Sequence, residues 1–258
     1  MATNPVVAVA KPVGSFFAMV LDTFVAFPKR PFQWRELIQQ MSFIASVCVG
    51  PTILLAIPFT VLVTFQLNNI LSEVGAIDLA GSGAALATVT QIGPIGTTFV
   101  VAGASATAIC ADIGARNIRE ELDAMRVLGI DPIQRLVVPR IIATMITTFF
   151  INGLLIFIGI AGGFFFSVYL QGATPGQFMN SLTLLVGFGE MVQSQIKAVV
   201  FGAVGGLVAC YRGLNVGGGP KGVGNAVNET VVYTFVLLFP MNVLLTQIPY
   251  ALGILGVK

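Results

Sequence analysis

Residues 141–170 read IIATMITTFFINGLLIFIGIAGGFFFSVYL and contain no Asp, Glu, Lys or Arg. This uncharged run continues to residue 189, and three further long runs, 37–72, 79–111 and 230–257, also lack all four charged residue types. A helix that crosses the hydrocarbon core of a bilayer needs about 20 apolar residues. Each run exceeds that length, so the sequence predicts an all-α integral membrane protein.

The composition of the 258 residues excludes a water-soluble fold. Only 9% of the residues are charged and 56% are hydrophobic, whereas a soluble domain has about 25% charged residues. The chain has no histidine, which excludes imidazole bases and histidine metal ligands. We expect Cys48, Cys110 and Cys210 to be free core thiols and not a disulfide or metal set. The net charge of +2 does not indicate a nucleic-acid partner.

We predict a single domain over residues 1–258 with five spans, at 37–72, 85–111, 141–170, 187–211 and 230–254. Before them, residues 13–36 place apolar side chains at helical spacing among charged ones, as in an amphipathic helix that lies in the membrane interface. A short additional span is the alternative for this segment. The first span is too long for a straight crossing, and Pro51 and Pro58 are its expected bends.

Glycine pairs at GxxxG spacing occur in two of the predicted spans. They are Gly159 with Gly163 and Gly202 with Gly206. Small residues at this spacing allow helix backbones to approach closely. We therefore expect the spans that contain them to pack tightly against neighbouring helices.

The distribution of basic residues predicts the topology. They gather before the first span, between the second and third, and between the fourth and fifth: Lys11, Lys29, Arg30, Arg35, Arg116, Arg119, Arg126, Arg135, Arg140, Arg212 and Lys221. The alternate loops contain Glu73 and Asp78, and then no charge in 171–180. The positive-inside rule therefore predicts a cytoplasmic N-terminus and an external, periplasmic C-terminus.

Residues 112–140 form the most polar segment and contain ten charged side chains. Asn117 and Glu120 have the spacing of a capping box, and Gly129 before Asp131-Pro132 is a helix stop signal. Between them, Leu122, Met125 and Val127 or Leu128 share one face. We predict an amphipathic helix over 117–130 at the cytoplasmic surface. It is either a loop helix that orients its neighbours or, as we favour, a docking surface for a soluble partner.

Lys197 lies inside the fourth span, seven residues after Glu190. A charge within a span is costly and usually faces the bundle interior or a cavity. Lys197 is therefore a candidate cation for a lipid carboxylate. The alternative, to which we give equal weight, is that its side chain snorkels to the outer membrane interface. Gln91, Asn68 and Asn69 are polar candidates in the outer half, where amides commonly bond neighbouring helices.

No ATP site is expected in this chain. The glycine-rich stretch Gly217–Gly224 lacks the G-x4-G-K-[ST] pattern of a phosphate-binding loop and follows no strand. We interpret it as a flexible cytoplasmic turn. Energy for any transport would have to come from a partner.

The run GARNIREELDAMRVLGIDPIQRLVVPR at 114–140 resembles the central signature of the YrbE/MlaE permease family, the membrane subunits of ABC transporters that work with Mce-type lipid-binding proteins. Further similar stretches are IGP at 92–94, AG at 102–103, ADIG at 111–114, IKAVVFG at 196–202 and GGPKGVGNAVNETVV at 218–232. The stretches PFQWRE at 31–36 and CYRG at 210–213 look most like actinobacterial YrbE proteins. The resemblance extends from about Phe32 to the end.

This resemblance implies a dimer of five-span subunits in the bacterial inner membrane, seated on two cytosolic ABC ATPases that bind ATP and Mg²⁺. The chain itself would need no cofactor and would not be an enzyme. A heterodimer with a second YrbE-type permease is favoured over a homodimer. The 117–130 helix would be the coupling helix, with candidate ATPase contacts at Arg119, Glu120, Glu121, Asp123, Arg126 and Asp131. Periplasmic Mce proteins would be further partners.

The implied function is lipid transport across or between envelope membranes, in the import direction. The implied cargo is fatty or mycolic acid, sterol or phospholipid. The candidate residues of the lipid path are Gln91, Pro94, Ala104, Lys197 and Asn68. MlaE-like relatives carry Arg-Glu where this chain has Thr90-Gln91, and Arg where it has Ala104. These neutral positions fit a less anionic or differently placed headgroup.

Two other classes of membrane protein would show different sequence features. An ion-coupled secondary carrier for a hydrophobic substrate usually shows intramembrane carboxylates and internal repeats. Here the spans contain Lys197 and Glu190, and no repeat is visible. A membrane-embedded lipid enzyme is disfavoured because histidine and clustered intramembrane carboxylates are lacking.

Overall fold

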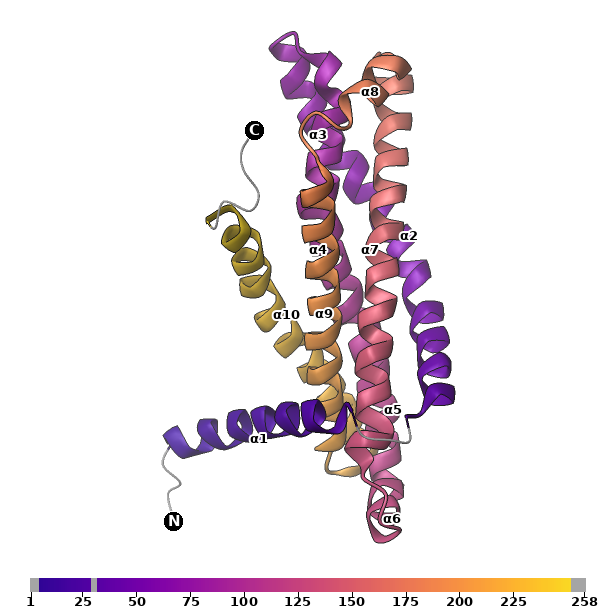
Figure 1. The fold of residues 1–258 in the computed structure, drawn as a ribbon, viewed down its shortest axis with the longest axis vertical. Coiled ribbons are helices and arrows are strands. Elements are labelled where there is room, and N and C mark those ends of the chain that lie inside the picture. Colours follow the sequence, from indigo (N-terminus) through magenta and orange to yellow (C-terminus); the bar gives the residue numbers. More distant parts are fainter. Residues whose placement is uncertain (1–4, 29–31, 252–258) are drawn as a thin grey trace.

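The uncharged run that begins at residue 141 forms the middle of the bundle. Its residues 141–170 lie in α7 (Val138–Leu170), which packs against α2 (Trp34–Glu73) on one side and α9 (Phe188–Leu214) on the other. The computed structural model describes residues 5–28 and 32–251, and every regular element in that part of the chain is helical. The predicted all-α fold is therefore confirmed (Figure 1).

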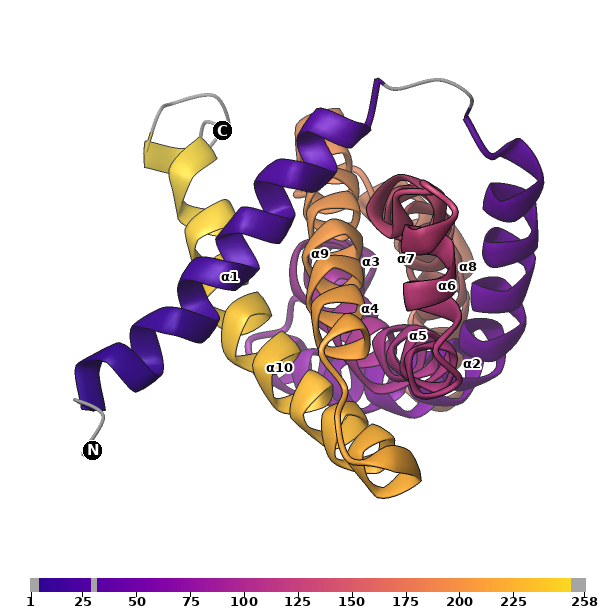
Figure 2. The same cartoon turned by 90° about the horizontal axis from the view of Figure 1, so that it is seen from below.

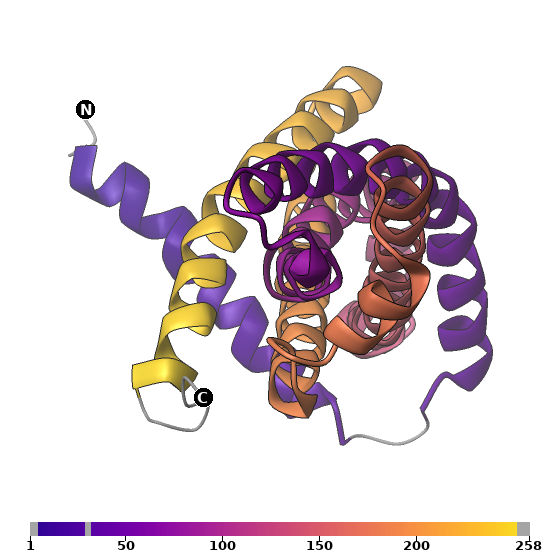
Figure 3. The same ribbon diagram turned by 90° about the horizontal axis from the view of Figure 1, so that it is seen from above.

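Five helical stretches in the described residues are long and apolar enough to cross a membrane. They are Trp34–Glu73, Ile77–Ile118, Ile133–Leu170, Phe188–Leu214 and Gly219–Pro249. Each contains most of one predicted span, and the helices extend into polar residues because backbone hydrogen bonding continues beyond the apolar core. Residues 252–254 of the predicted last span lie outside the described residues. In the view from above, α2 curves around the side of α7 (Figure 3), as expected for a helix with Pro51 and Pro58 in its interior.

The second span is a composite helix of small residues. It consists of a short 3₁₀ turn (Ile77–Leu79), α3 (Ala80–Ala87), a π-turn (Thr88–Ile92), α4 (Gly93–Val100), a second π-turn (Val101–Ser105) and α5 (Ala106–Ile118). The first π-turn ends two residues before Pro94, whose ring would clash with the carbonyl four residues earlier in a regular helix. Widened turns of this kind occur frequently at functional sites.

Glycines bring α7 and α9 into close contact, as their spacing predicts. A Cβ atom at Gly202 would lie 2.8 Å from the backbone oxygen of Thr144 in α7. A Cβ atom at Gly206 would lie 2.7 Å from Thr144 Oγ1. On the other side of α7, a Cβ atom at Gly159 would lie 2.6 Å from Thr88 Cγ2. A side chain at Gly202 would therefore meet the backbone of α7, whereas one at Gly206 or Gly159 would displace a threonine side chain of a neighbouring helix.

The N-terminal helix lies across one end of the bundle, transverse to the long helices (Figures 1 and 2). This α1 runs from Pro5 to Ala26, so the predicted bounds of 13–36 were wrong at both ends. Pro28 disfavours helical geometry in the residue before it, and Trp34 already begins α2. Part of the predicted helix, residues 29–31, lies outside the described residues.

The remaining elements close the bundle at its two ends. A short helix, α6 (Glu121–Val127), projects beyond the bundle at the end where α1 lies, and a π-turn (Ile133–Val137) leads from it into α7. At the opposite end, α8 (Pro175–Ser181) packs against α3. The last helix, α10 (Gly219–Ala251), packs against α5 and α9 near α6 and leans away from α9 toward the other end (Figure 1).

Candidate functional site: a protruding short helix and an intramembrane lysine

The connection between the second and third spans differs from the predicted helix over 117–130. The span continues through Asn117 to Ile118, the chain turns at Arg119 and Glu120, and α6 covers only Glu121–Val127. Glu120 has a φ of 59°, in the left-handed region. Asn117 is not an N-cap, because its Nδ2 donates hydrogen bonds to the carbonyls of Leu214 (3.1 Å) and Val216 (2.9 Å) at the end of α9.

The predicted coupling charges are brought together around α6. Arg119 Nε lies 2.7 Å from Glu121 Oε1, and Arg126 Nη1 lies 2.8 Å from Asp123 Oδ1. Both pairs are exposed, and exposed ion pairs contribute only about 0–1 kcal/mol to stability. These four charged side chains could therefore leave their ion pairs and contact a partner protein with little loss of stability. Asp131 has a local role instead, because its Oδ1 accepts a hydrogen bond from the Ile133 amide at the start of the next helix (2.9 Å).

An apolar tip on this segment was missed by the sequence analysis. Val127 is 88% exposed and Leu128 is 74% exposed, although one of them was expected to share a face with Leu122 and Met125. Leu122 is indeed buried. The helix is shorter than predicted and ends at Val127, with Leu128 as its C-cap and Gly129 turning the chain at a φ of 73°, so Val127 and Leu128 lie at its exposed end. Exposed neighbouring apolar side chains of this size are typical of an interaction surface.

Arg140 forms a buried ion-pair network at the base of this segment, which the sequence analysis also missed. Its side chain is fully buried at the start of α7, and Nη2 pairs with Asp112 Oδ2 on α5. Nη2 also lies 3.5 Å from Glu36 Oε1 on α2, and Nη1 donates to the Leu136 carbonyl (3.0 Å). The sequence shows opposite charges at the ends of three spans. It does not show which of them pair, because the partners are far apart in the chain.

Lys197 faces the interior of the bundle. It is 2% exposed, and Nζ donates hydrogen bonds to Thr246 Oγ1 on α10 (2.8 Å) and to the Thr90 carbonyl (3.5 Å) in the first π-turn. The alternative of snorkelling to the interface was therefore wrong. Glu190 does not pair with it in the structure, since Glu190 Oε2 accepts from the Gly187 amide (2.8 Å) at the start of α9. None of the ion pairs found among the described residues includes Lys197.

A pocket of about 370 Å³ lies beside Lys197. Its lining residues come from α2, the second span, α9 and α10: Leu67, Gly83, Leu86, Ala87, Thr90, Gln91, Gln193 and Thr246. Thr90 and Thr246 are also the two hydrogen-bond partners of Lys197. The lining is mostly apolar with a few polar groups at one point, the usual composition of a small-molecule site.

Of the other predicted lipid-path residues, Gln91 lines this pocket, and Pro94, Ala104 and Asn68 do not. Gln91 is exposed and contributes to the lining, whereas Pro94 is buried in α4. Ala104 is half-buried in the second π-turn. Asn68 is buried, and its Nδ2 donates to Ser167 Oγ (2.7 Å) and Gln171 Oε1 (2.6 Å), so it bonds α2 to α7. The three cysteines are buried and free, as expected.

Five membrane-spanning helices, a pocket beside a buried cation and a short helix projecting from one end define a polytopic membrane-transport subunit. The sequence profile of the family described as Permease MlaE matches residues 37–248. The chain therefore belongs to the MlaE permease family, whose members are the membrane subunits of ABC transporters.

Curated relatives agree with this assignment. A probable ABC transporter permease protein of Synechocystis is 30% identical over 216 residues, covering 84% of this chain and 82% of the relative. A probable ABC transporter permease protein of Rickettsia bellii is 27% identical over 243 residues, 94% of this chain and 93% of the relative. The intermembrane phospholipid transport system permease protein MlaE of Haemophilus influenzae is 25% identical over 261 residues, 98% of this chain and the whole relative.

Proposed function

We propose that this chain is the permease subunit of an ABC-type lipid transporter in the bacterial inner membrane. The observation that carries the proposal is α6, a short helix between two spans with a bare apolar tip at Val127 and Leu128. The family assignment supports a partner ATPase as the protein that covers this tip. The name of the Haemophilus relative, which refers to intermembrane phospholipid transport, supports a lipid as the transported molecule.

The proposed topology has α1 and α6 on the cytoplasmic side and the C-terminus in the periplasm. Arginines concentrate around α6, and Arg212 lies in the last turn of α9, whose final carbonyl accepts a hydrogen bond from Asn117. This distribution agrees with the positive-inside rule. An ATPase in the cytosol would then reach Val127 and Leu128 directly. ATP and Mg²⁺ would be bound by that ATPase.

The proposed assembly contains a second permease chain, with a heterodimer of YrbE-type subunits favoured over a homodimer. A pair of ATPases would dock on the two copies of α6. Periplasmic Mce-type lipid-binding proteins would exchange lipid with the outer side of the dimer. The proposed direction of transport is import.

The proposed lipid path includes the pocket beside Lys197. A carboxylate or phosphate that enters next to Thr90 and Thr246 would find one buried cation and two polar groups that already contact it. The rest of the lining, with Leu67, Leu86 and Ala87, would contact hydrocarbon. Fatty or mycolic acid, sterol and phospholipid are the candidate cargoes.

Reconstitution separates this proposal from an ion-coupled secondary carrier. The complex purified with its ATPase would be placed in liposomes that contain a fluorescent fatty acid and, in parallel, a fluorescent phospholipid. We expect lipid transfer that requires hydrolysable ATP and is indifferent to an imposed proton or sodium gradient. Transfer that runs on an ion gradient without ATP would replace the proposal with the carrier alternative.

A further inference from the structure

A second pocket lies at the opposite end of α9 from the N-terminal part that contains Lys197. It has a volume of about 480 Å³ and is bounded by α1, α9 and α10. Its lining consists of Pro12, Val13, Phe16, Phe17, Val208, Tyr211, Arg212, Tyr233, Val236 and Leu237. Tyr211 follows Lys197 by fourteen positions, which corresponds to about 21 Å along a helix, so this groove is separate from the proposed lipid path.

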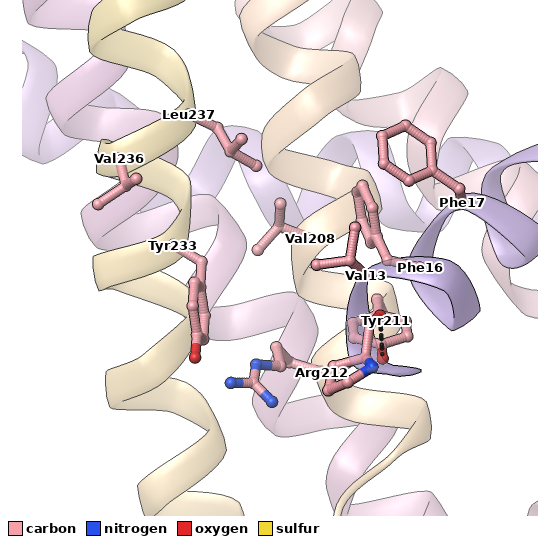
Figure 4. Close-up of a pocket in the computed structure, with 10 residues that line it drawn as sticks. Val13, Phe16, Phe17, Val208, Tyr211, Arg212, Tyr233, Val236 and Leu237 are labelled. Carbon is pink, nitrogen blue, oxygen red and sulfur yellow. Dashed lines mark hydrogen bonds between the residues drawn. The ribbon is translucent and has the colours of Figure 1, made fainter. Parts of the chain in front are cut away.

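The transverse helix α1 forms one wall of this groove and is fixed there by Tyr211. The Tyr211 hydroxyl lies 2.9 Å from the Pro12 carbonyl and 2.6 Å from Ser15 Oγ. The rings of Phe16 and Tyr211 meet edge to face, with centroids 5.4 Å apart. Figure 4 shows Val13 and Phe16 of α1 on one side of the groove and Val236 and Leu237 of α10 on the other.

Arg212 provides the charge at the edge of the groove. Its guanidinium lies between Tyr211 and Tyr233 at the lower edge in Figure 4, with its carbon 4.4 Å from the centre of the Tyr233 ring. Nη2 is 2.5 Å from Glu229 Oε2, and the arginine side chain is still 23% exposed. A guanidinium has five N–H donors, so one ion pair leaves donors for a second anion.

We propose that this groove binds one acyl chain of a membrane lipid and that Arg212 binds the anionic phosphate of the same lipid's headgroup. The volume lies within the ~300–1,000 Å³ of ordinary ligand pockets. A second helix is a poor occupant, since a helix about 10 Å across would fit only about one turn into this space. A transverse helix beside arginine and tyrosine is typical of the membrane interface, where a phosphate group lies next to the start of its acyl chain.

Photolabelling tests the acyl-chain part of this proposal. The full-length chain, purified in its complex, would be placed in phosphatidylcholine nanodiscs with added phosphatidylglycerol that carries a photoreactive acyl chain. We expect labelled peptides from α1, α9 and α10, and about tenfold less label when Val236→Trp fills the groove. Val243→Trp is the matched control, because it is a similarly exposed valine on α10 outside the groove. Equal labelling of both variants would overturn the site.

Exchange of the headgroup tests the role of Arg212. With wild-type protein, photoreactive phosphatidylglycerol should label the groove several-fold more than photoreactive diacylglycerol, which has the same acyl chains but no phosphate, and Arg212→Gln should abolish this preference. Glu229→Gln keeps the arginine and removes its competing partner, so it should increase the preference and provides a readout if Arg212→Gln fails to assemble. Equal labelling by both lipids in wild type would overturn the headgroup assignment. Crosslinks from a photoreactive residue at Val236 to a second protein chain would overturn the lipid as occupant.

Discussion

Arg140 and Asp112 form an ion pair that closes the base of the segment carrying α6. Asp112 lies in the last two turns of α5, Arg140 lies in the first turn of α7, and α6 lies between them in the chain. Glu36 extends the contact to α2. Through one guanidinium, the segment proposed to receive the ATPase is therefore fixed to three of the five spans.

Removal of this arginine should destabilise the fold. Arg140→Met leaves the carboxylates of Asp112 and Glu36 without their buried partner, but these carboxylates are partly exposed and Asp112 still contacts Arg116. The cost should therefore be below the ~3–5 kcal/mol of a fully buried pair. We expect a clear loss of thermal stability in the purified protein, measured by the temperature dependence of monodispersity. Arg116→Met is the control, because Arg116 contacts the same Asp112 (3.3 Å) from a partly exposed position and should change stability by less than about 1 kcal/mol.

The apolar tip of α6 should contribute more to ATPase binding than the charges around it. Burial of a leucine side chain contributes about 1.5–3 kcal/mol, so Leu128→Glu should weaken ATPase binding by at least about tenfold. Co-purification with the tagged ATPase measures the effect, and Leu128→Met is the control that keeps an apolar side chain. Retention of the ATPase by Leu128→Glu would show that docking does not use this tip.

The charged contacts of α6 are tested separately by Glu121→Lys combined with Asp123→Lys. The double reversal removes the exposed pairs with Arg119 and Arg126 and places like charges where an ATPase would meet acidic ones. Mismatched charges at an interface can cost several kcal/mol. We expect reduced ATPase co-purification and reduced lipid uptake while the spans remain folded. Wild-type values for both would mean that these charges do not contact the ATPase.

Close packing between α7 and α9 makes Gly202 intolerant of any side chain. Its Cβ would meet the Thr144 backbone at 2.8 Å, and backbone cannot move aside as a flexible side chain can. We expect Gly202→Ala to lower the unfolding temperature measurably. Gly50 in α2 has open space around its Cβ position, so Gly50→Ala should be neutral or slightly stabilising, since alanine favours a helix by about 1 kcal/mol over glycine.

The spans and their packing were predictable because the signals are local. Charge-free runs and GxxxG spacing are properties of consecutive residues, and they identified every span and the contact at Gly202. The segment around α6 was predicted less well because its geometry depends on distant residues. Asn117 has the spacing of an N-cap, but two carbonyls at the end of α9, those of Leu214 and Val216, bind its side chain and keep it in α5. No pattern within 112–140 contains those partners.

The same limit applies to the charged side chains. In the sequence, Arg140 resembles the other basic residues of the cytoplasmic loop. Its burial depends on ion pairs with Asp112 and Glu36, which come from two other helices. The Lys197 side chain could point into the bundle interior or reach the outer interface, and both placements were equally consistent with its position in a span. The structure distinguishes them because Lys197 bonds Thr246 of α10, a residue 49 positions away in sequence.

Lys197 gives the sharpest test of the proposed lipid path. Lys197→Met keeps the length and apolar volume of the side chain and deletes the charge, so the fold and ATPase binding should be retained. A charge-assisted hydrogen bond contributes about 1.5–3 kcal/mol. We therefore expect uptake of a fluorescent fatty acid by the reconstituted complex to fall about tenfold, and Lys197→Arg to recover part of it.

Thr246→Val is the matched control for this experiment. It removes the hydroxyl that accepts from Lys197 Nζ at 2.8 Å but leaves the cation beside the pocket, so uptake should fall much less than in Lys197→Met. If both variants lose uptake equally, the hydrogen bond between α9 and α10 matters and the charge does not. If Lys197→Met loses the assembled complex, the lysine is structural. Only selective loss of uptake in an intact complex, with partial recovery by arginine, agrees with a cation that balances the charge of the lipid.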